Sequence, residues 1–409
     1  SPSRHSTPRT SRTARLTRTA RPTTATTMTA LASLRAPSAS MRASTRRTGH
    51  TDAGRKMMMS ARTRNASASL PTTTRASADA DAPTYTKIFD ATTGQDVEVL
   101  WQSVHAVDVG DGATWSYRKG VPAEDCATLK STKIVFAHGL GACAYTFRNV
   151  QRALQERGFT SYAFDATGHG DSSKPAPGRG VAGYDAAATG AALEEFLTAT
   201  GLASEPVDLV MHGFVIPQHV LLYVAKNPKK FRRVVLMNTP LTNAHAYPPQ
   251  MATFTRPFGM GKGAAFDAAG YLYNGNEFAL PGEVLEEYEK PYSGAQAEAA
   301  RAAAEAYVTK CDLKKVSKQV IDALQSRGLP KIRVIWGTAD RYLDDATIYD
   351  WCSDVRASFS AMRKVGHMPQ EDFVDETAAR IADFLDSDLK VSALSSVRVG
   401  KITSDDGQG

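Results

Sequence analysis

The chain has 409 residues, with 49 Lys and Arg against 42 Asp and Glu and a formal net charge of +7. The charge is uneven, because residues 1–82 hold 15 basic and three acidic side chains (+12), which leaves 34 basic and 39 acidic residues (−5) in the remainder. The remainder also has no basic stripe with interleaved aromatic residues. A globally basic protein is therefore excluded, and we expect no nucleic-acid partner.

The hydrophobic content of 42% is ample for a large buried core. No apolar run reaches the roughly eighteen residues that a spanning helix needs, so we expect no membrane span. The cysteines Cys126, Cys143, Cys311 and Cys352 are scattered without zinc-ligand spacing. The sequence indicates no metal and no cofactor.

Residues 1–82 are rich in Arg, Ser, Thr and Ala and poor in acidic and large apolar residues. Such a segment cannot bury enough surface to offset its ordering entropy, so we expect it to be disordered. The composition is typical of organelle transit peptides. Its hydroxyl richness favours import into the chloroplast stroma over the mitochondrion, and an untargeted basic tail is the alternative.

From residue 83 onward, short apolar runs alternate with helical patterns. Strands are expected at 96–105, 113–118, 133–139, 160–168, 207–211, 233–238, 331–337 and 358–365. Apolar stripes predict helices between them and a last helix around Ile381. Repeated βα units predict an α/β fold with a mostly parallel central sheet flanked by helices.

The stretch between the strands at 233–238 and 331–337 is far longer than a crossover needs. It contains helical patterns at 282–292 and 295–310. We therefore divide the folded part into a core (83–240), an inserted helical cap (241–330) and a second core part (331–388). A flexible C-terminal tail is expected at 389–409.

Five landmarks follow these strands in order: HGLG from His138, DATGHGDSSKP from Asp165, the corner VMHGFV at 210–215, GTAD from Gly337 and VGH ending at His367. Together they resemble the α/β-hydrolase superfamily. The chain is most similar to the capped branch that contains epoxide hydrolases, haloalkane dehalogenases and their plant and algal plastid relatives.

The resemblance implies roles for the loop after the strand at 133–139. Gly139 would let the backbone approach a substrate, and the N–H groups of Leu140 and Phe214 would form an oxyanion hole. His138 is interpreted as a structural hydrogen-bonder that braces the loop. His367 matches the family's general base, and Asp340 matches the acid that orients it.

Gly213 stands where the family carries its Ser or Asp nucleophile. Glycine tolerates the backbone of such a corner but offers no attacking atom. Cys143 as a thiol nucleophile and His212 in a shifted register are weaker alternatives. A third possibility is a His367–Asp340 dyad that activates water directly. With no serine at the corner, we expect no reaction with fluorophosphonate probes.

Two functions follow. The first is an organellar hydrolase of a small apolar ester, epoxide or lactone that uses the dyad without a Ser or Asp nucleophile. The second is an inactive pseudo-hydrolase that binds a small ligand or another protein. Four insertion tyrosines resemble ring-opening acids, but we interpret them as packing residues: Tyr247, Tyr271, Tyr273 and Tyr292.

Overall fold

The computed structural model describes residues 82–90, 93–325 and 328–387. The expected transit segment and C-terminal tail thus lie almost wholly outside the described residues. Within them, nine strands form one sheet in the order β1-β2-β3-β5-β4-β6-β7-β8-β9. The strands are β1 (Thr84–Asp90), β2 (Gln95–Asp108), β3 (Thr114–Gly120), β4 (Ile134–Ala137), β5 (Ser161–Phe164), β6 (Val207–His212), β7 (Phe231–Met237), β8 (Lys331–Gly337) and β9 (Ser358–Met362).

The strands from β5 through β4 to β9 run parallel, whereas β1, β2 and β3 pair antiparallel at one edge. The prediction of a mostly parallel sheet flanked by helices is confirmed. Strand β1 was not predicted. Its residues alternate between half-buried and exposed, as in a ribbon that packs on one face only.

The sheet is buried on both faces because its central strands are apolar at nearly every position. All residues of β4 and β6 are buried. Alternate residues of the strands enter two separate hydrophobic clusters, with Val135 and Leu209 in one and Phe136 and Val210 in the other. This division is the period-two signature of a strand with a core on each side.

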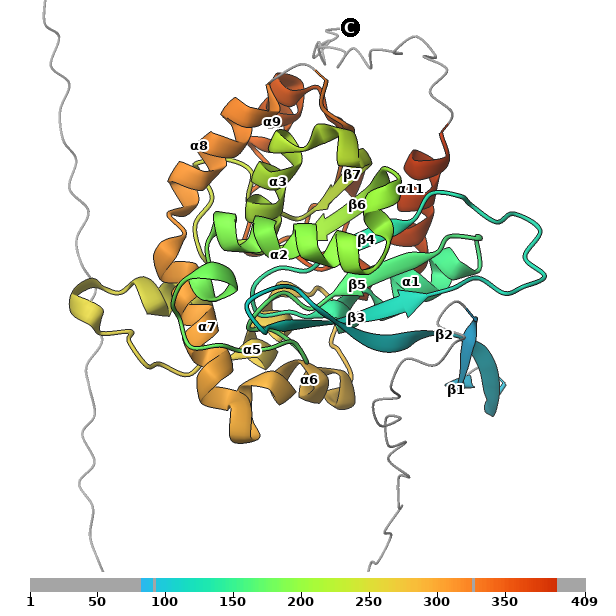
Figure 1. Ribbon diagram of the computed structural model, residues 1–409, viewed down its shortest axis with the longest axis horizontal. Helices are drawn as coiled ribbons and strands as arrows, with labels where there is room; N and C mark the ends of the chain where they lie inside the picture. Colours follow the sequence, from blue (N-terminus) through green and yellow to red (C-terminus); the bar gives the residue numbers. More distant parts are fainter. Residues whose placement is uncertain (1–81, 91–92, 326–327, 388–409) are drawn as a thin grey trace, which may run out of the picture. The chain divides into compact units, whose positions relative to one another are not determined.

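Helices supply the other half of each core. Helices α1 (Arg148–Gln155) and α11 (Val374–Asp386) pack together over one face, whereas α2 (Ala186–Ala199) and α3 (Ile216–Lys226) pack together over the other (Figure 1). Two further helices, α9 (Ile348–Val355) and α10 (Pro369–Asp372), belong to the segment that follows β8.

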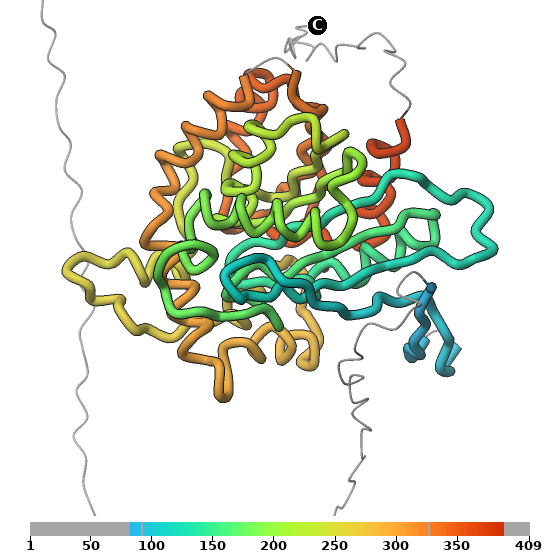
Figure 2. Tube along the Cα trace, viewed as in Figure 1, coloured from blue at the N-terminus to red at the C-terminus, as the bar shows by residue number. Residues whose placement is uncertain are grey.

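The insertion between β7 and β8 is helical. Its helices are α4 (Pro249–Ala252), α5 (Ala268–Gly275), α6 (Gly282–Glu289), α7 (Ala297–Lys310) and α8 (Leu313–Leu324). In Figure 2 this segment is coloured from yellow to orange, and its last helix, α8, is labelled in Figure 1. Helix α8 packs on α3, so this last part of the segment predicted as a cap lies against the core.

None of the helices described is long and apolar enough to cross a membrane.

Candidate active site

The corner between β6 and α3 has an unusual backbone. Gly213 has a φ of +88°, and Val215 has a φ of 68° and a ψ of −65°. The Ile216 N–H donates to the Phe214 carbonyl at 2.9 Å and closes a γ-turn around Val215. A β-branched residue in such a turn is strained, and strain of this kind is concentrated at functional sites. This makes the corner the first candidate for chemistry.

The loop after β4 lies directly against this corner. A Cβ atom on Gly139 would lie 2.6 Å from the Phe214 nitrogen, so only glycine fits there. The Leu140 N–H donates to the Phe214 carbonyl at 2.9 Å. The structure thus brings the two expected oxyanion donors together, but an oxyanion role for Leu140 would require this hydrogen bond to break.

His138 connects the same loop to the segment after β5. Its Nδ1 lies 2.8 Å from the Gly139 carbonyl, and its Nε2 accepts a hydrogen bond from the Ala166 N–H at 3.0 Å. Burial lowers the pKa of His138 to about 4, although the Gly139 carbonyl opposes the shift. The neutral ring with both nitrogens engaged braces the loop and cannot transfer a proton without losing a contact.

Asp340 and His367 form a pair on neighbouring loops, after β8 and after β9. His367 Nδ1 lies 2.8 Å from Asp340 Oδ2, and both side chains are buried. The same oxygen accepts from Asn238 at 2.8 Å, while Oδ1 accepts from the backbone of Tyr342 at 2.7 Å and of Leu343 at 3.1 Å. The carboxylate is therefore held in one orientation, with its acceptor sites filled.

These contacts keep Asp340 ionised. Burial by itself raises the pKa of Asp340, but the charge and hydrogen bond of His367, together with the other donors, hold the pKa below its usual value. An ionised Asp340 accepts the Nδ1 proton of His367. The imidazole Nε2 is then left as the acceptor, as a general base requires.

Tyr271 of α5 occupies that acceptor. Its hydroxyl lies 2.9 Å from His367 Nε2, and its side chain is 1% exposed. The sequence analysis interpreted Tyr271 as a packing residue together with three other tyrosines of the insertion. Two of these lie in other surroundings, because the Tyr247 hydroxyl donates to the Cys311 carbonyl and Tyr273 is 61% exposed. No sequence signal separates Tyr271 from the other three.

His212, at the end of β6, contacts His367 of the pair. Its Nε2 lies 2.8 Å from the His367 carbonyl, which lets it donate a hydrogen bond there, and its ring centroid is 4.9 Å from that of His367. Burial, and next the nearby His367, lower the pKa of His212 to about 3. A buried neutral imidazole committed to a carbonyl is a positioning group rather than a nucleophile.

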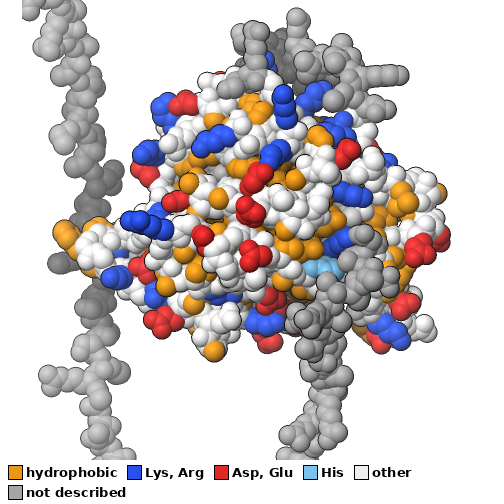
Figure 3. All heavy atoms as spheres, in the orientation of Figure 1, with side chains coloured by type: hydrophobic (Ala, Val, Ile, Leu, Met, Phe, Trp, Pro, Cys, Tyr) orange, Lys and Arg blue, Asp and Glu red, His pale blue; other side chains and the backbone are white. Residues whose placement is uncertain are grey.

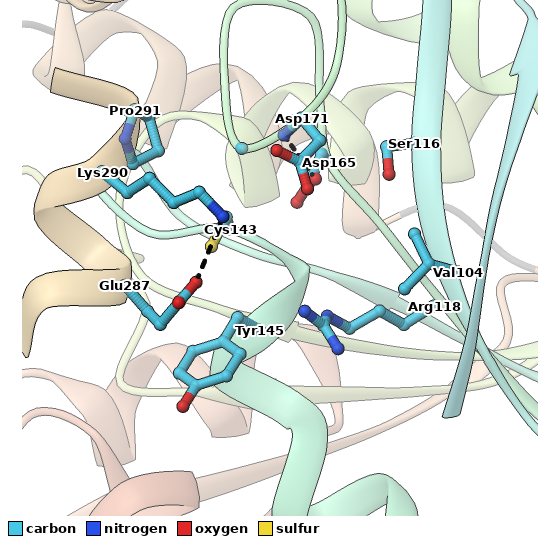
Figure 4. Close-up of a pocket in the computed structure, with 11 residues that line it drawn as sticks. Val104, Ser116, Arg118, Cys143, Tyr145, Asp165, Asp171, Glu287, Lys290 and Pro291 are labelled. Carbon is cyan, nitrogen blue, oxygen red and sulfur yellow. Dashed lines mark hydrogen bonds and ion pairs between the residues drawn. The ribbon is translucent and has the colours of Figure 1, made fainter. Parts of the chain in front are cut away.

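A small polar cavity of about 30 Å³ lies between β3 and the insertion. Figure 4 shows Asp165 and Asp171 on one side of it and Glu287 and Lys290 on the other. Cys143 also lines this cavity, whereas the dyad does not. Burial raises the pKa of the Cys143 thiol, and Asp165 adds to the rise, so neither contribution favours the thiolate that a nucleophilic cysteine needs.

The described residues also show how metal-ligating and charged side chains are distributed. Among residues 82–90, 93–325 and 328–387, no group of three or more His, Cys, Asp or Glu side chains could hold a metal ion. On the face seen in Figure 3, acidic and basic side chains are interspersed rather than gathered into a stripe of one sign.

Residues 134–380 match the family model described as the alpha/beta hydrolase family. The chain therefore belongs to that family, in agreement with the resemblance seen in its motifs. Comparison with curated proteins gives no match.

Solved structures show the same fold. A haloalkane dehalogenase, DbeA from Bradyrhizobium elkani USDA94, is similar at 18% identity and a TM-score of 0.58, over 69% of this chain and 97% of its own. A putative lipase from Acinetobacter baumannii AYE is similar at 18% identity and a TM-score of 0.55, over 69% and 91%. Cfl2 from Burkholderia cenocepacia is similar at 18% identity and a TM-score of 0.55, over 74% and 99%.

Proposed function

We propose that this protein is a hydrolase of a small apolar ester, epoxide or lactone, with His367 as general base and Asp340 as its orienting acid. The observation that carries the proposal is the buried His367–Asp340 pair at 2.8 Å, whose imidazole ring lies 5.4 Å from the ring of Phe214, the residue after Gly213 at the corner. Burial excludes water from such a pair, and the carboxylate fixes the imidazole tautomer, so the imidazole can act as a general base.

Gly213 stands at the nucleophile position in this proposal. Neither a serine nor an aspartate is present there to form the usual covalent intermediate. The base must therefore act on water or on another hydroxyl. Because the side chains of His367 and Tyr271 are buried, the substrate must enter through an opening of the segments that cover them.

The test is turnover by the full chain of a panel of p-nitrophenyl esters, aliphatic epoxides and lactones. We expect His367→Ala and Asp340→Asn to reduce kcat/KM by about 10²–10⁴-fold, because each removes the oriented base. His105→Ala, on β2, is the control and should keep full activity. Equal activity of His367→Ala and the unmodified chain would contradict the proposal.

The alternative is a catalytically inactive protein that binds a small ligand or a protein partner. The specific observation in its favour is that the Leu140 N–H is already bonded to Phe214, beside a glycine that carries no attacking atom. Absence of turnover across the panel, together with a ligand-dependent rise in Tm, would support this alternative.

We also propose chloroplast import for the precursor, with the mitochondrion as the second choice. Support comes from the composition of residues 1–82, with 15 basic and three acidic side chains.

A further inference from the structure

The Tyr271 hydroxyl completes a chain of three groups. Asp340 Oδ2 is 2.8 Å from His367 Nδ1, and Tyr271 Oη is 2.9 Å from His367 Nε2. Because Nδ1 donates to the ionised carboxylate, Nε2 must accept, and the phenol is the donor. Acid, imidazole and hydroxyl are therefore arranged in the order of a Ser-His-Asp triad, with a phenol in place of the serine hydroxyl.

Gly213 leaves space beside this hydroxyl. A Cβ atom on Gly213 would lie 4.0 Å from Tyr271 Oη and 3.1 Å from the Gly139 Cα. A side chain grown from the corner would therefore extend into the region where Tyr271 Oη lies. The Tyr271 hydroxyl, which comes from α5, therefore lies next to the place that a side chain at residue 213 would occupy.

Helix α5 is fastened to the loops that carry the acid and the base. The Tyr342 hydroxyl donates to the Tyr271 carbonyl at 2.7 Å, and the two rings stack with centroids 5.3 Å apart. The His367 N–H donates to the Gly275 carbonyl at 2.7 Å. Tyr342 also donates its own N–H to Asp340. The phenol is thus positioned by the dyad's own loops, as a reacting group must be.

We propose that Tyr271 is the nucleophile of a Tyr271–His367–Asp340 triad that replaces the nucleophile absent from Gly213. This inference rests on the proposed hydrolase function and names the attacking atom of that same site. Its substrates are carboxylic esters and lactones, because acyl transfer to a phenol oxygen requires a carbonyl carbon.

Acylation proceeds as follows for an ester. Tyr271 Oη attacks the carbonyl carbon while His367 Nε2 takes the phenol proton, and Asp340 stabilises the imidazolium. The bond to the leaving alkoxide breaks, and the alkoxide takes the proton from His367 to depart as an alcohol. The enzyme is left as an aryl ester of Tyr271.

Deacylation reverses these roles. A water molecule gives a proton to His367 as its oxygen attacks the acyl carbon, and the Tyr271 phenolate leaves and takes that proton back. One ester and one water yield one acid and one alcohol. A phenolate leaves more readily than an alkoxide, so the acyl-tyrosine is reactive enough to turn over.

The burial of Tyr271 makes it dependent on the base. Burial raises the pKa of Tyr271 well above its usual value, and Tyr342 and Asp340 add to the rise. The phenol is neutral at physiological pH and must lose its proton during the attack. Removal of His367 should therefore abolish the reactivity of Tyr271 as well as turnover.

The test is covalent labelling of the full chain with p-nitrophenyl acetate and with a fluorophosphonate probe, followed by peptide mass spectrometry. We expect the adduct on Tyr271, in contrast to the absence of labelling expected from sequence. Tyr271→Phe and His367→Ala should lose the adduct and about 10³-fold or more of esterase turnover. Tyr273→Phe, on the same helix with its side chain 61% exposed, is the matched control and should keep both.

The outcomes separate this inference from the proposed function. Turnover that persists in Tyr271→Phe but not in His367→Ala overturns the triad and leaves the hydrolase standing. A stoichiometric adduct on Tyr271 without turnover supports the nucleophile and contradicts the hydrolase. An adduct confined to another residue, or no adduct at all on the unmodified chain, overturns the triad even where a phenylalanine variant fails to fold.

Discussion

At the residue scale, Gly213 combines two requirements in one position. Its φ of +88° favours a residue without Cβ, and a Cβ atom there would lie 3.1 Å from the Gly139 Cα. Gly201 has a similar φ of +74° but nothing within 4 Å of an added Cβ. A comparison of the two glycines therefore separates backbone strain from close contact.

We expect Gly201→Ala to lower the free energy of unfolding by about 1 kcal/mol through its backbone alone. Gly213→Ala should lower it by roughly 1–3 kcal/mol more, because the methyl group presses on the backbone of Gly139. Urea unfolding of the two variants measures the difference. Equal losses in the free energy of unfolding would show that the loop after β4 moves at little cost to accommodate the methyl group.

At the element scale, a buried ion pair joins α1 to α10. A tyrosine of α6, in the insertion, donates a hydrogen bond to the carboxylate of this pair. Arg148 donates to both carboxylate oxygens of Glu371, at 2.6 Å and 3.1 Å, and the two side chains are 7% and 2% exposed. The Tyr288 hydroxyl donates to the same carboxylate at 2.5 Å. Burial by itself lowers the pKa of Arg148, but Glu371 outweighs this and raises it.

Breaking this pair should be costly because one charge would remain buried. We expect Glu371→Gln and Arg148→Met each to lower the free energy of unfolding by about 3–5 kcal/mol, and the double variant to lose less than their sum. The exposed Lys318–Asp322 pair is the control, and its removal should change stability by no more than about 0.5 kcal/mol. Additive losses in the buried pair would argue against direct coupling.

At the scale of the whole described part of the chain, we expect the buried neutral histidines to dominate the response of stability to acid. Burial lowers the pKa of His138 and His219 to about 4 and that of His212 to about 3, and it lowers the pKa of His169 well below its usual value. The unfolded chain therefore binds more protons than the folded one below about pH 6.5, and acid favours unfolding.

One carboxyl opposes this trend. Burial raises the pKa of Asp165 to about 6, so between about pH 6 and pH 4 the folded state binds a proton that the unfolded state does not. We expect a net loss of several kcal/mol in the free energy of unfolding from pH 7 to pH 5, measured by urea titration at each pH. His219→Gln should reduce the loss by about 2 kcal/mol, and Asp165→Asn should increase it. A flat profile would show that these side chains are solvated.

The strands, the parallel sheet and the family could be predicted from sequence, because they depend on local apolar runs and on landmarks in order along the chain. Strand β1 could not, since its alternation is half-exposed and short. The placement of α8 on α3 also could not, because apolar periodicity shows that a helix has a buried face but not which surface covers it.

The sequence by itself determined which loops meet at the carboxyl ends of the parallel strands, and with them His367, Asp340 and the glycine at residue 213. These positions follow from chain order within a regular sheet. Tertiary structure alone decided that Tyr271, 96 residues before His367, donates to its Nε2, and that Phe214 engages the Leu140 N–H. The physical reason is that both contacts depend on how a helical insertion and two loops pack, and no local pattern encodes that packing.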